Sequence, residues 1–414
     1  MRLLYSLSIR IFSLLVLLSS PFNAKARQWI KGRRGVFDRL RKNIEKNDRI
    51  IWFHCASLGE FEQGRPLMEA VKRDYPDHRI LLTFFSPSGY EVRKDYSVAD
   101  IVCYLPADTQ FNAARFVKTV HPRLVFFIKY EFWFNYIDQL ARRNVPVFVV
   151  SAIFRRSQYF FRPWGKWSQK QLRKITFFFV QNEKSMALLR MVRVTHAAVS
   201  GDTRFDRVLK IKSEAADFPL IDSFADKGST LVAGSTWPPD EDILRSLLEN
   251  YKGKLKLVIA PHVTSPENIE RIRQKFIEFN PVIYSKQENH NMSRSSVMII
   301  DIMGKLAYIY RYGKIAYVGG GFGNGIHNTL EAATYGIPVL FGPKYSRFQE
   351  AVIMQERGCG FPVHDERECL HVVEELLGDV KKYAHASAVA DRYVQESAGA
   401  VKKVLEKASP FLKA

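Results

Sequence analysis

The segment from Gly319 to Gly325 holds five glycines, and His327, Asn328 and Glu331 follow it closely. A loop this rich in glycine lets a ligand approach the bare backbone. A helix that starts after such a loop directs free N–H groups at an anion, so the pattern favours phosphate binding. A carboxylate three residues after Asn328 could accept both hydroxyl hydrogens of a ribose. A glycine-rich connector with an ordinary helix cap is the open alternative.

A second segment, His54–Glu60, ends an apolar run and begins a helical one. Gly59 permits a tight turn, and Ser57 lies beside it. Glu60 is then expected at the carboxyl edge of a sheet, where a carboxylate can act as a general base. The alternative is that Glu60 only favours the dipole in the first turn of its helix.

Three smaller patterns follow expected strands of the C-terminal half. Each lies at the end of a strand or at the start of a helix, so the three could converge on one ligand. Helix caps and a solvated histidine are the alternatives. The residues are Gly234, Ser235 and Thr236, then Pro261 and His262, then Met303, Gly304 and Lys305.

Two further patterns belong to the N-terminal half. Glu131 lies in the segment Lys129–Trp133 and is a second candidate carboxylate, with a buried ion pair as the alternative. Arg155 and Arg156 lie among aromatic residues and suit a phosphorylated lipid. Aromatic packing under a solvated charged loop explains the same residues equally well.

The elements that must position these residues alternate between short apolar runs and amphipathic segments. The alternation predicts parallel sheets covered by helices on both faces, an α/β class. In the N-terminal half we expect helices over 61–73, 108–120 and 132–143. The expected strands are Ile50–Cys55, Ile80–Phe85, Ile101–Tyr104, Leu124–Ile128, Val147–Ser151 and Phe177–Val180.

A second series of the same kind begins near Thr230. Residues 201–228 are polar and turn-rich, which predicts a crossing between two domains. Two doubly wound domains imply a cleft, with ligands at the carboxyl ends of the strands. The expected helices are 241–249, 265–279, 326–335 and 347–357, and the expected strands are Thr230–Ala233, Leu255–Ala260, Val282–Tyr284, Val297–Ile300, Ile315–Val318 and Pro338–Phe341.

Composition limits the possible functions. The 414 residues carry a net charge of +20, and residues 1–49 hold twelve Lys and Arg against three Asp and Glu. This concentration at one end favours an anionic membrane surface over nucleic acid, for which no basic and aromatic signature is present. The four cysteines, Cys55, Cys103, Cys359 and Cys369, have no metal-ligand or disulfide spacing, so we expect no metal site.

The N-terminus carries an apolar run from Ile11 to Leu18. A cleaved signal peptide is one interpretation, since Ala24–Ala26 resembles a cleavage site. The basic residues directly after it favour retention on the cytoplasmic side. We therefore expect an uncleaved membrane anchor over residues 1–24, with the rest of the chain at the cytoplasmic face.

Taken together, these motifs resemble the family of 3-deoxy-D-manno-octulosonic acid (Kdo) transferases of lipopolysaccharide synthesis. The resemblance runs nearly end to end. It includes the basic N-terminus, His54–Glu60, Glu131–Trp133, Ser151–Arg155, Gly234–Thr236, Asp301–Leu306 and the glycine loop through Glu331. It implies a GT-B fold: two Rossmann-like domains, acceptor-binding over 25–200 and donor-binding over 230–414, joined by a linker over 201–229 and facing a central cleft.

The resemblance also implies a reaction at the inner membrane. An inverting enzyme without metal or other cofactor would move Kdo from CMP-Kdo to a lipid A precursor, lipid IVA, with Glu60 as general base. Ser57, Gly59, Glu131, Arg155 and Arg156 would serve the acceptor. The donor residues would be Gly234, Ser235, Thr236, Pro261, His262, Met303, Gly304, Lys305, Gly321, Gly325, His327, Asn328, Thr329, Leu330 and Glu331.

Some positions depart from the family pattern. Many members have Pro-Arg-His where this chain has Pro261-His262, so a positive charge near the donor is missing or comes from Lys305. Lys129 stands where an acidic residue is common. Two other functions stay possible: a UDP-sugar enzyme of the lipid A disaccharide synthase or epimerase type, and a non-catalytic sugar-nucleotide sensor at the membrane.

Overall fold

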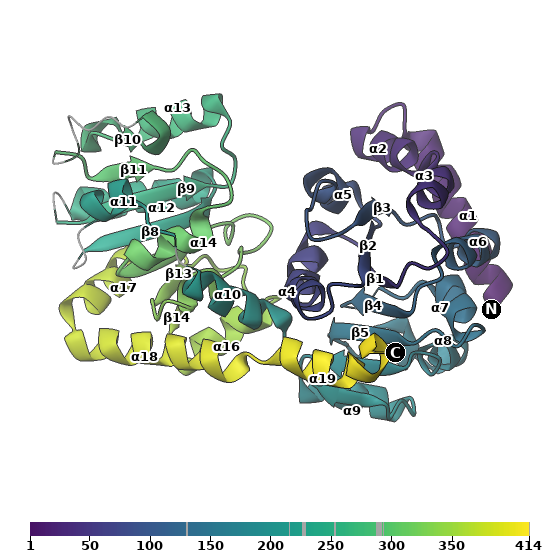
Figure 1. Cartoon of the computed structure of the whole chain (residues 1–414). Coiled ribbons are helices and arrows are strands. Elements are labelled where there is room, and N and C mark those ends of the chain that lie inside the picture. Colours follow the sequence, from purple (N-terminus) through teal and green to yellow (C-terminus); the bar gives the residue numbers. More distant parts are fainter. Residues whose placement is uncertain are drawn as a thin grey trace. The chain divides into compact units, whose positions relative to one another are not determined.

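The computed structural model describes residues 1–129, 131–214, 216–225, 229–251, 254–286, 292 and 294–413. The chain forms two compact units, shown in Figure 1. The first unit contains Met1–Arg207 together with Ala398–Ala414, and the second contains Val208–Ser397. Each unit has its own parallel sheet with helices on both faces.

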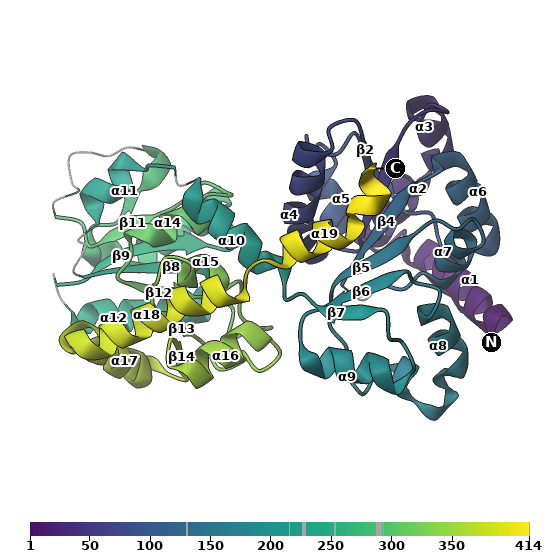
Figure 2. The same cartoon turned by 60° about the horizontal axis from the view of Figure 1, so that its bottom comes forward.

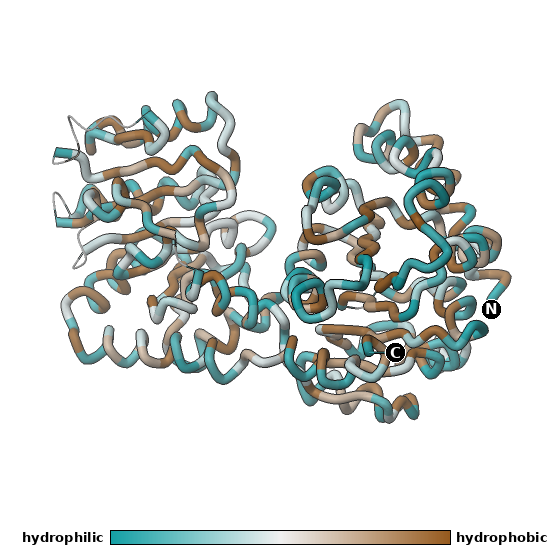
Figure 3. The backbone as a smooth tube through the Cα atoms, viewed as in Figure 1, coloured by the Kyte–Doolittle hydropathy of each residue, from teal (hydrophilic) through white to brown (hydrophobic). Residues whose placement is uncertain are grey.

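The described part of the first unit builds a seven-stranded parallel sheet in the order β3-β2-β1-β4-β5-β6-β7. Its strands are continuous apolar runs, and all five residues of β4 are buried, as expected for a sheet covered on both faces. Figure 3 shows these runs as brown segments inside each unit. The strands are β1 (Ile50–Cys55), β2 (Arg79–Phe84), β3 (Ile101–Tyr104), β4 (Leu124–Ile128), β5 (Val147–Ala152), β6 (Phe177–Val180) and β7 (Ala197–Val199).

The helices of the first unit include three that precede the sheet. Of the described helices only α1 is long and apolar enough to cross a membrane, and none of its residues is buried. The helices are α1 (Arg2–Ser19), α2 (Ala24–Arg33), α3 (Val36–Asn43), α4 (Leu58–Asp74), α5 (Pro87–Arg93), α6 (Gln110–Val120), α7 (Phe134–Ala141), α8 (Lys166–Leu172), α9 (Glu183–Met191) and α19 (Ala400–Lys413), with short 3₁₀ turns η1 (Tyr159–Phe161) and η2 (Pro163–Gly165). Helix α10 (Thr203–Ser213) begins in the first unit and ends in the second.

The second unit repeats this architecture, with the described strands in the order β10-β11-β9-β8-β12-β13-β14. The strands are β8 (Thr230–Thr236), β9 (Lys256–Pro261), β10 (Val282–Ile283), β11 (Val297–Ile299), β12 (Ile315–Val318), β13 (Val339–Phe341) and β14 (Gly360–Pro362). The helices are α11 (Pro219–Phe224), α12 (Pro238–Asn250), α13 (Pro266–Lys275), α14 (Leu306–Ile309), α15 (Leu330–Ala333), α16 (Gln349–Arg357), α17 (Glu366–Gly378) and α18 (Val380–Ser397), with 3₁₀ turns η3 (Ile277–Phe279), η4 (Tyr284–Lys286) and η6 (Tyr310–Tyr312).

Both sheets reverse their strand order once. In the first unit β1 has β2 on one side and β4 on the other, and in the second unit β8 lies between β9 and β12. In open parallel sheets such a reversal separates the loops that follow the two central strands and leaves room for a ligand. The segment His54–Glu60 contains the end of β1, and Lys129 directly follows β4, so the fold brings two predicted segments to one edge of the sheet.

Two boundaries between the domains differ from those expected from the sequence. Residues 201–228 were expected to form a polar crossing, but the described part holds α10 and α11, whose apolar positions include the buried Val208 and Ile221. The C-terminal segment was expected in the donor domain, but α19 belongs to the first unit. Its buried Val404, Ala408 and Leu412 recur every fourth residue and join the core of that unit. Figure 2 shows α19 beside α4.

Candidate functional site

The first candidate site lies where β1 and β4 end side by side. Glu60 is only 7% exposed and occupies the third position of α4. Its Oε2 accepts hydrogen bonds from the backbone N–H and from the hydroxyl of Ser57, both at 2.7 Å. This is a capping box, so the helix-capping interpretation of Glu60 describes a real contact. Capping uses one carboxylate oxygen, and among the described residues Oε1 has no hydrogen-bond partner.

Glu131 reaches the same place from the loop after β4. Burial and, secondarily, the negative charge of Glu60 raise the pKa of Glu131 from 4.5 to about 7, while Lys129 opposes the shift. Lys129 itself adopts a left-handed backbone conformation with φ 71°, which turns the chain sharply after the strand. The alternative interpretation, a buried ion pair, is therefore not the main influence on the pKa of Glu131. A carboxyl group with this pKa is present in both protonation states near neutral pH.

A chain of hydrogen bonds supports this loop, and sequence reasoning assigned no specific role to its members. Trp133 Nε1 donates to His54 Nε2 at 2.8 Å, so Nδ1 carries the proton of the imidazole and donates to Thr83 Oγ1 at 2.9 Å. Trp52 Nε1 also donates to Thr83 Oγ1, at 2.7 Å. Burial lowers the pKa of His54 to about 3, so the ring is neutral. These bonds fix Trp133, two residues from Glu131.

The other predicted acceptor residues lie on the surface around this point. Gly59, Arg155 and Arg156 are exposed, and Ser57 is half-buried. The two arginines follow β5, where Ser151 has φ 53° and its buried hydroxyl contacts Thr203 Oγ1 at 3.0 Å. The structure thus anchors the start of this loop firmly. Both arginine side chains remain available to solvent.

The second candidate site lies where β8 and β12 end side by side. The N–H of Gly319 donates to the carbonyl of Gly234 at 2.9 Å, which joins the two strand ends. A Cβ on Gly234 would lie 2.1 Å from the hydroxyl oxygen of Tyr310. A Cβ on Gly321 would lie 2.5 Å from Cα of Gly342. Glycine is required at both positions, at Gly234 because the side chains of Tyr310 and Leu306 lie against it and at Gly321 because the backbone of Gly342 does.

A buried aspartate that sequence reasoning missed holds the glycine loop. Asp240 is 1% exposed and accepts hydrogen bonds from the N–H groups of Gly320 and Trp237 and from the hydroxyl of Tyr317, each at 2.9 Å. Burial raises the pKa of Asp240, and these three donors oppose the rise. The signal available in the sequence was an acidic residue three positions after the strand-ending Trp237, as in a capping box.

Three aromatic rings gather at the ends of β8, β9 and the glycine loop. The ring of His262 stacks on Trp237 at 4.7 Å and on His327 at 4.6 Å between centroids. Trp237 Nε1 donates to His327 Nε2 at 3.3 Å. Burial and the neighbouring His262 lower the pKa of His327 to about 4. Two predicted donor residues therefore meet, together with Trp237, which was not predicted.

The segment Asn328–Glu331 forms a compact turn instead of the long helix expected over 326–335. The structure has a single helical turn, α15, that starts at Leu330. Asn328 Nδ2 donates to Glu331 Oε1 at 3.0 Å, and the N–H of Leu330 donates to Asn328 Oδ1 at 3.2 Å. The predicted proximity of Asn328 and Glu331 is confirmed. The turn replaces the helix because Asn328 bonds to the local backbone, as asparagine commonly does.

The remaining predicted donor residues are placed less closely. Thr236 and Thr329 are buried, and among the described residues neither hydroxyl has a hydrogen-bond partner. Ser235 adopts φ 55° and Gly325 φ 127°, and Pro261 is the buried last residue of β9. Three further residues, Met303, Gly304 and Lys305, are exposed, and within the described part of the chain none of them forms a hydrogen bond with the glycine loop. The helix expected after them is only the short α14.

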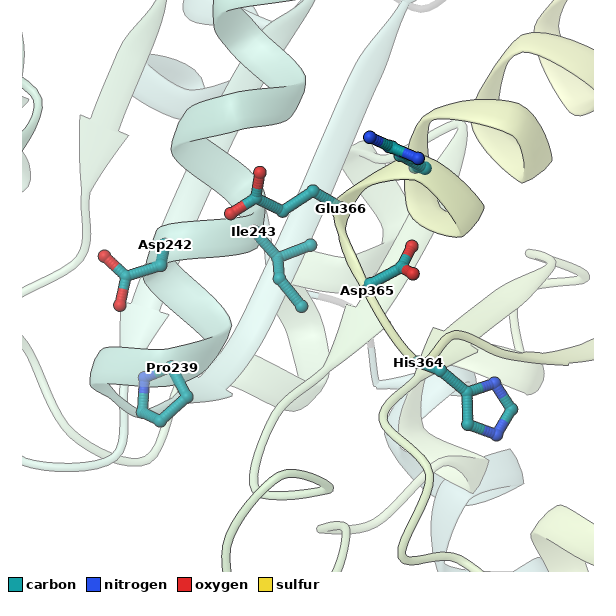
Figure 4. A pocket seen from close by; sticks show the side chains of 7 residues that line it. Pro239, Asp242, Ile243, His364, Asp365 and Glu366 are labelled. Carbon is teal, nitrogen blue, oxygen red and sulfur yellow. The ribbon is translucent and has the colours of Figure 1, made fainter.

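A pocket of about 430 Å³ lies apart from these residues, between α12 and the start of α17. Figure 4 shows its mainly polar lining, which includes Asp242, His364, Asp365 and Glu366. None of the residues predicted to bind a ligand lines it. Within the described ranges no group of three or more His, Cys, Asp or Glu side chains is arranged to hold a metal ion.

Solved structures define the class to which this architecture belongs. The UDP-GlcNAc 2-epimerase from Neisseria meningitidis, solved with UDP-GlcNAc, superposes with a TM-score of 0.60 at 16% identity and covers 86% of this chain and 98% of that one. MurG from Acinetobacter baumannii superposes with a TM-score of 0.56 at 10% identity, covering 86% and 98%. The two parallel Rossmann-like units thus form a GT-B fold, as the resemblance implied.

Sequence comparison relates the chain to one family within that class. The model of the 3-deoxy-D-manno-octulosonic-acid transferase (kdotransferase) family matches residues 29–207. The Kdo transferase of Aquifex aeolicus is 29% identical over 350 residues, which cover 83% of this chain and 90% of that protein. The Kdo transferase of Haemophilus influenzae is 28% identical over 381 residues, covering 87% of each. Residues 29–207 therefore match the Kdo transferase family, and the similarity to Kdo transferases over most of the chain identifies it as a glycosyltransferase.

Proposed function

We propose that this glycosyltransferase moves Kdo from CMP-Kdo to a lipid A precursor, lipid IVA, with inversion and without a metal ion. The observation that carries the proposal is the fixed carboxylate of Glu60 at the reversal of the first sheet. Ser57 holds Oε2, and Oε1 has no hydrogen-bond partner among the described residues. The sequence similarity supports the donor and the acceptor class, since the relatives are Kdo transferases.

In the proposed reaction Glu60 acts as general base. Its Oε1 takes the proton from a hydroxyl of the acceptor while the hydroxyl oxygen bonds to the anomeric carbon of Kdo. The bond from that carbon to the phosphate of CMP breaks in the same displacement, and CMP leaves with the bonding electron pair. Attack opposite to the leaving group inverts the anomeric centre. Glu131, partly protonated near neutral pH, donates a hydrogen bond that orients the acceptor.

The second unit is proposed to hold the nucleotide. Glu331, positioned by Asn328, accepts the ribose hydroxyls. The tightly packed glycine loop offers backbone N–H groups to the phosphate, and the buried hydroxyls of Thr236 and Thr329 are further donors. His262 and Trp237 present an exposed aromatic surface beside them. CMP is a good leaving group, so stabilising its phosphate suffices without a strong acid.

The proposed location is the cytoplasmic face of the inner membrane. The apolar surface of α1 and the exposed basic residues that follow it support this location. In the first unit the exposed Arg155 and Arg156 are placed to contact phosphate groups of the lipid acceptor. Ser57 and Gly59 complete the acceptor side beside Glu60.

The test combines the purified protein with CMP-Kdo and a tetra-acylated lipid A precursor and follows the product mass. We expect a gain of Kdo, unchanged by EDTA, and its loss in Glu60→Ala. UDP-GlcNAc replaces CMP-Kdo in a parallel reaction, because a UDP-sugar enzyme would use it instead. Binding of CMP-Kdo without transfer, unaffected by Glu60→Ala, would instead identify a sensor.

A further inference from the structure

Helix α1 presents two different faces. Its half-exposed residues recur every three or four positions and form one stripe: Tyr5, Ser6, Ile9, Ser13 and Val16. This stripe contains three polar side chains and faces the protein. We call it the inner stripe. The opposite face, called the leucine face, is almost entirely leucine and isoleucine, and its residues are 49% to 80% exposed: Leu3, Leu4, Leu7, Ile11, Leu14, Leu15, Leu17 and Leu18.

The inner stripe is attached to the first unit by a buried polar contact. The hydroxyl of Tyr5 donates to Asp108 Oδ2, and Asp108 also accepts the N–H groups of Asn135 and Tyr136 at 3.1 Å. The ring of Tyr5 lies 5.1 Å from that of Phe134. Asp108 is 1% exposed, so removing Tyr5 would leave a buried carboxyl short of one donor.

Further contacts extend along the helix. Arg2 pairs with Asp138 at 2.9 Å at one end, and the ring of Phe12 lies 6.0 Å from those of Trp29 and Phe85. Residues 2–12 therefore touch the protein over about 15 Å of helix. A helix that crossed the bilayer would carry these side chains into hydrocarbon and break both polar contacts.

The attachment points share one place in the fold. Phe85 follows β2, Asp108 follows β3 and Phe134 follows β4, each just after the carboxyl end of its strand. Glu60 and Glu131 lie at the same edge of the sheet. The helix thus lies along the side of the first unit that carries the predicted acceptor site, as Figure 1 and Figure 2 both show for α1 and the neighbouring α7.

We propose that α1 lies flat in the cytoplasmic leaflet, docked on the first unit, and does not span the membrane. The leucine face enters the acyl chains, and the axis runs along the surface, as in interfacial amphipathic helices. The 18 residues of α1 are close to the length of a full span, about 20 apolar residues, but they include Arg2 and Arg10, and Arg2 is paired with Asp138.

The charges beside α1 match an anionic lipid surface as its occupant. Lys25, Arg27, Lys31 and Arg34 are exposed on and just after α2, directly after the leucine face. Arg33 is not part of this surface, because its guanidinium donates to the carbonyl oxygens of Trp29, Phe85 and Leu105. This inference rests on the proposed function for its lipid acceptor: a flat α1 brings the edge with Glu60 to the bilayer surface, where the acceptor lies.

Depth-dependent fluorescence quenching tests the orientation. The full chain is reconstituted in vesicles of phosphatidylethanolamine and phosphatidylglycerol. Single cysteines carry an environment-sensitive fluorophore, and quenchers are placed at defined depths along the lipid chains. The four native cysteines are buried and serve as an unreactive background. The probe positions on the leucine face are Leu4→Cys, Leu7→Cys, Ile11→Cys, Leu15→Cys and Leu18→Cys. The matched controls on the inner stripe are Ser6→Cys and Ser13→Cys.

A flat helix predicts one shallow depth for all outer positions and at least tenfold weaker quenching at Ser6 and Ser13. A depth that passes through a maximum near Ile11, with Ser13 quenched as strongly, would show a spanning helix and overturn the proposal. Unquenched outer positions in a dimeric protein would show that a second copy covers the leucine face, which also overturns it. Kdo transfer is not the readout, so an inactive enzyme with a flat helix contradicts only the proposed function.

Discussion

The two units have their candidate sites at the same topological position, but different kinds of contact hold the two sites together. In the first unit, side chains bond to side chains: Ser57 to Glu60, and Trp133 to His54 and on to Thr83. In the second unit, glycine backbone contacts backbone around Gly234, Gly319 and Gly321, with Asp240 as the main side-chain support. A reacting group needs a fixed direction, whereas a phosphate needs close approach to N–H groups.

The comparison predicts that substitutions in the two units will have different effects. A polar substitution in the first unit should change the reaction rate and leave donor affinity intact. Added volume in the glycine loop of the second unit should change donor affinity and local stability. Substitutions ordered from the largest expected effect to the smallest test this difference.

The largest effect is expected for Glu60→Gln. The amide can still cap α4 but cannot take a proton, so transfer should fall on the order of 10²–10⁴-fold with CMP binding unchanged. Single-turnover kinetics and CMP titration measure the two quantities. Glu62→Gln is the matched control on the same helix, because Glu62 pairs with Arg93 and plays no part in the proposal. Equal losses in both variants would contradict a base at Glu60.

Glu331→Gln should weaken the donor side. One charge-assisted contact to the ribose is lost, which corresponds to about 1.5–3 kcal/mol or roughly 10–100-fold in the Kd for CMP. Isothermal titration calorimetry checks this, with the exposed Glu356→Gln as the control for net charge. An unchanged Kd in Glu331→Gln would remove this residue from the nucleotide site.

Gly321→Ala should distort the glycine loop. Its Cβ would meet the backbone of Gly342 at 2.5 Å, whereas the control Gly323→Ala meets nothing closer than the Gly320 carbonyl oxygen at 3.5 Å. Overpacking of this kind typically costs about 1–3 kcal/mol. Thermal unfolding and CMP binding should both weaken in Gly321→Ala. If the two variants behaved alike, the close backbone contact would not matter.

Trp133→Phe should loosen the support of Glu131. Removing the indole N–H leaves His54 Nε2 as a buried acceptor without a donor, at a cost of about 1–3 kcal/mol. We expect a lower melting temperature and a lower kcat, with the Kd for CMP unchanged. The control is Trp164→Phe, because Trp164 is 69% exposed, and it should lower neither the melting temperature nor kcat. A shift in CMP affinity would contradict the separation of the two units' roles.

The smallest effect concerns pH. The pKa of Glu131 rises from 4.5 to about 7 on folding, so the folded chain binds this proton more tightly than the unfolded chain. Its contribution to the free energy of unfolding is therefore full below pH 4.5 and is lost as the pH rises towards 7 and above. Glu131→Gln should flatten that part of the stability profile, measured by denaturant titration at several pH values. A profile identical to that of the wild type would show that the pKa of Glu131 does not change on folding.

Most of the fold was predictable because both sheets are built from apolar runs. Ile101–Tyr104, Leu124–Ile128 and Ile315–Val318 were predicted with their observed bounds, since each is an apolar run that begins directly after a charged residue. β7 and β14 were missed. They have only three residues each, too few to show a strand pattern.

The candidate sites were predictable as segments but not as contacts. The glycine loop, Glu60 and Glu331 could be named because their types carry chemistry at strand ends. Asp240, Trp237 and the His54–Trp133 pair could not, because their roles depend on partners far away in sequence, such as Gly320 for Asp240. The helix predicted over 326–335 failed because small apolar residues there favour a helix, yet Asn328 closes a turn first.

The return of α19 to the first unit sets an order for biosynthesis. The second unit is one uninterrupted stretch, 208–397, so all of it is synthesised before α19. The first unit lacks its last seventeen residues until then. α4, which begins at the Glu60 capping box, packs against α19. The helix that carries the proposed base is therefore covered last, and synthesis of the second unit is complete before that of the first.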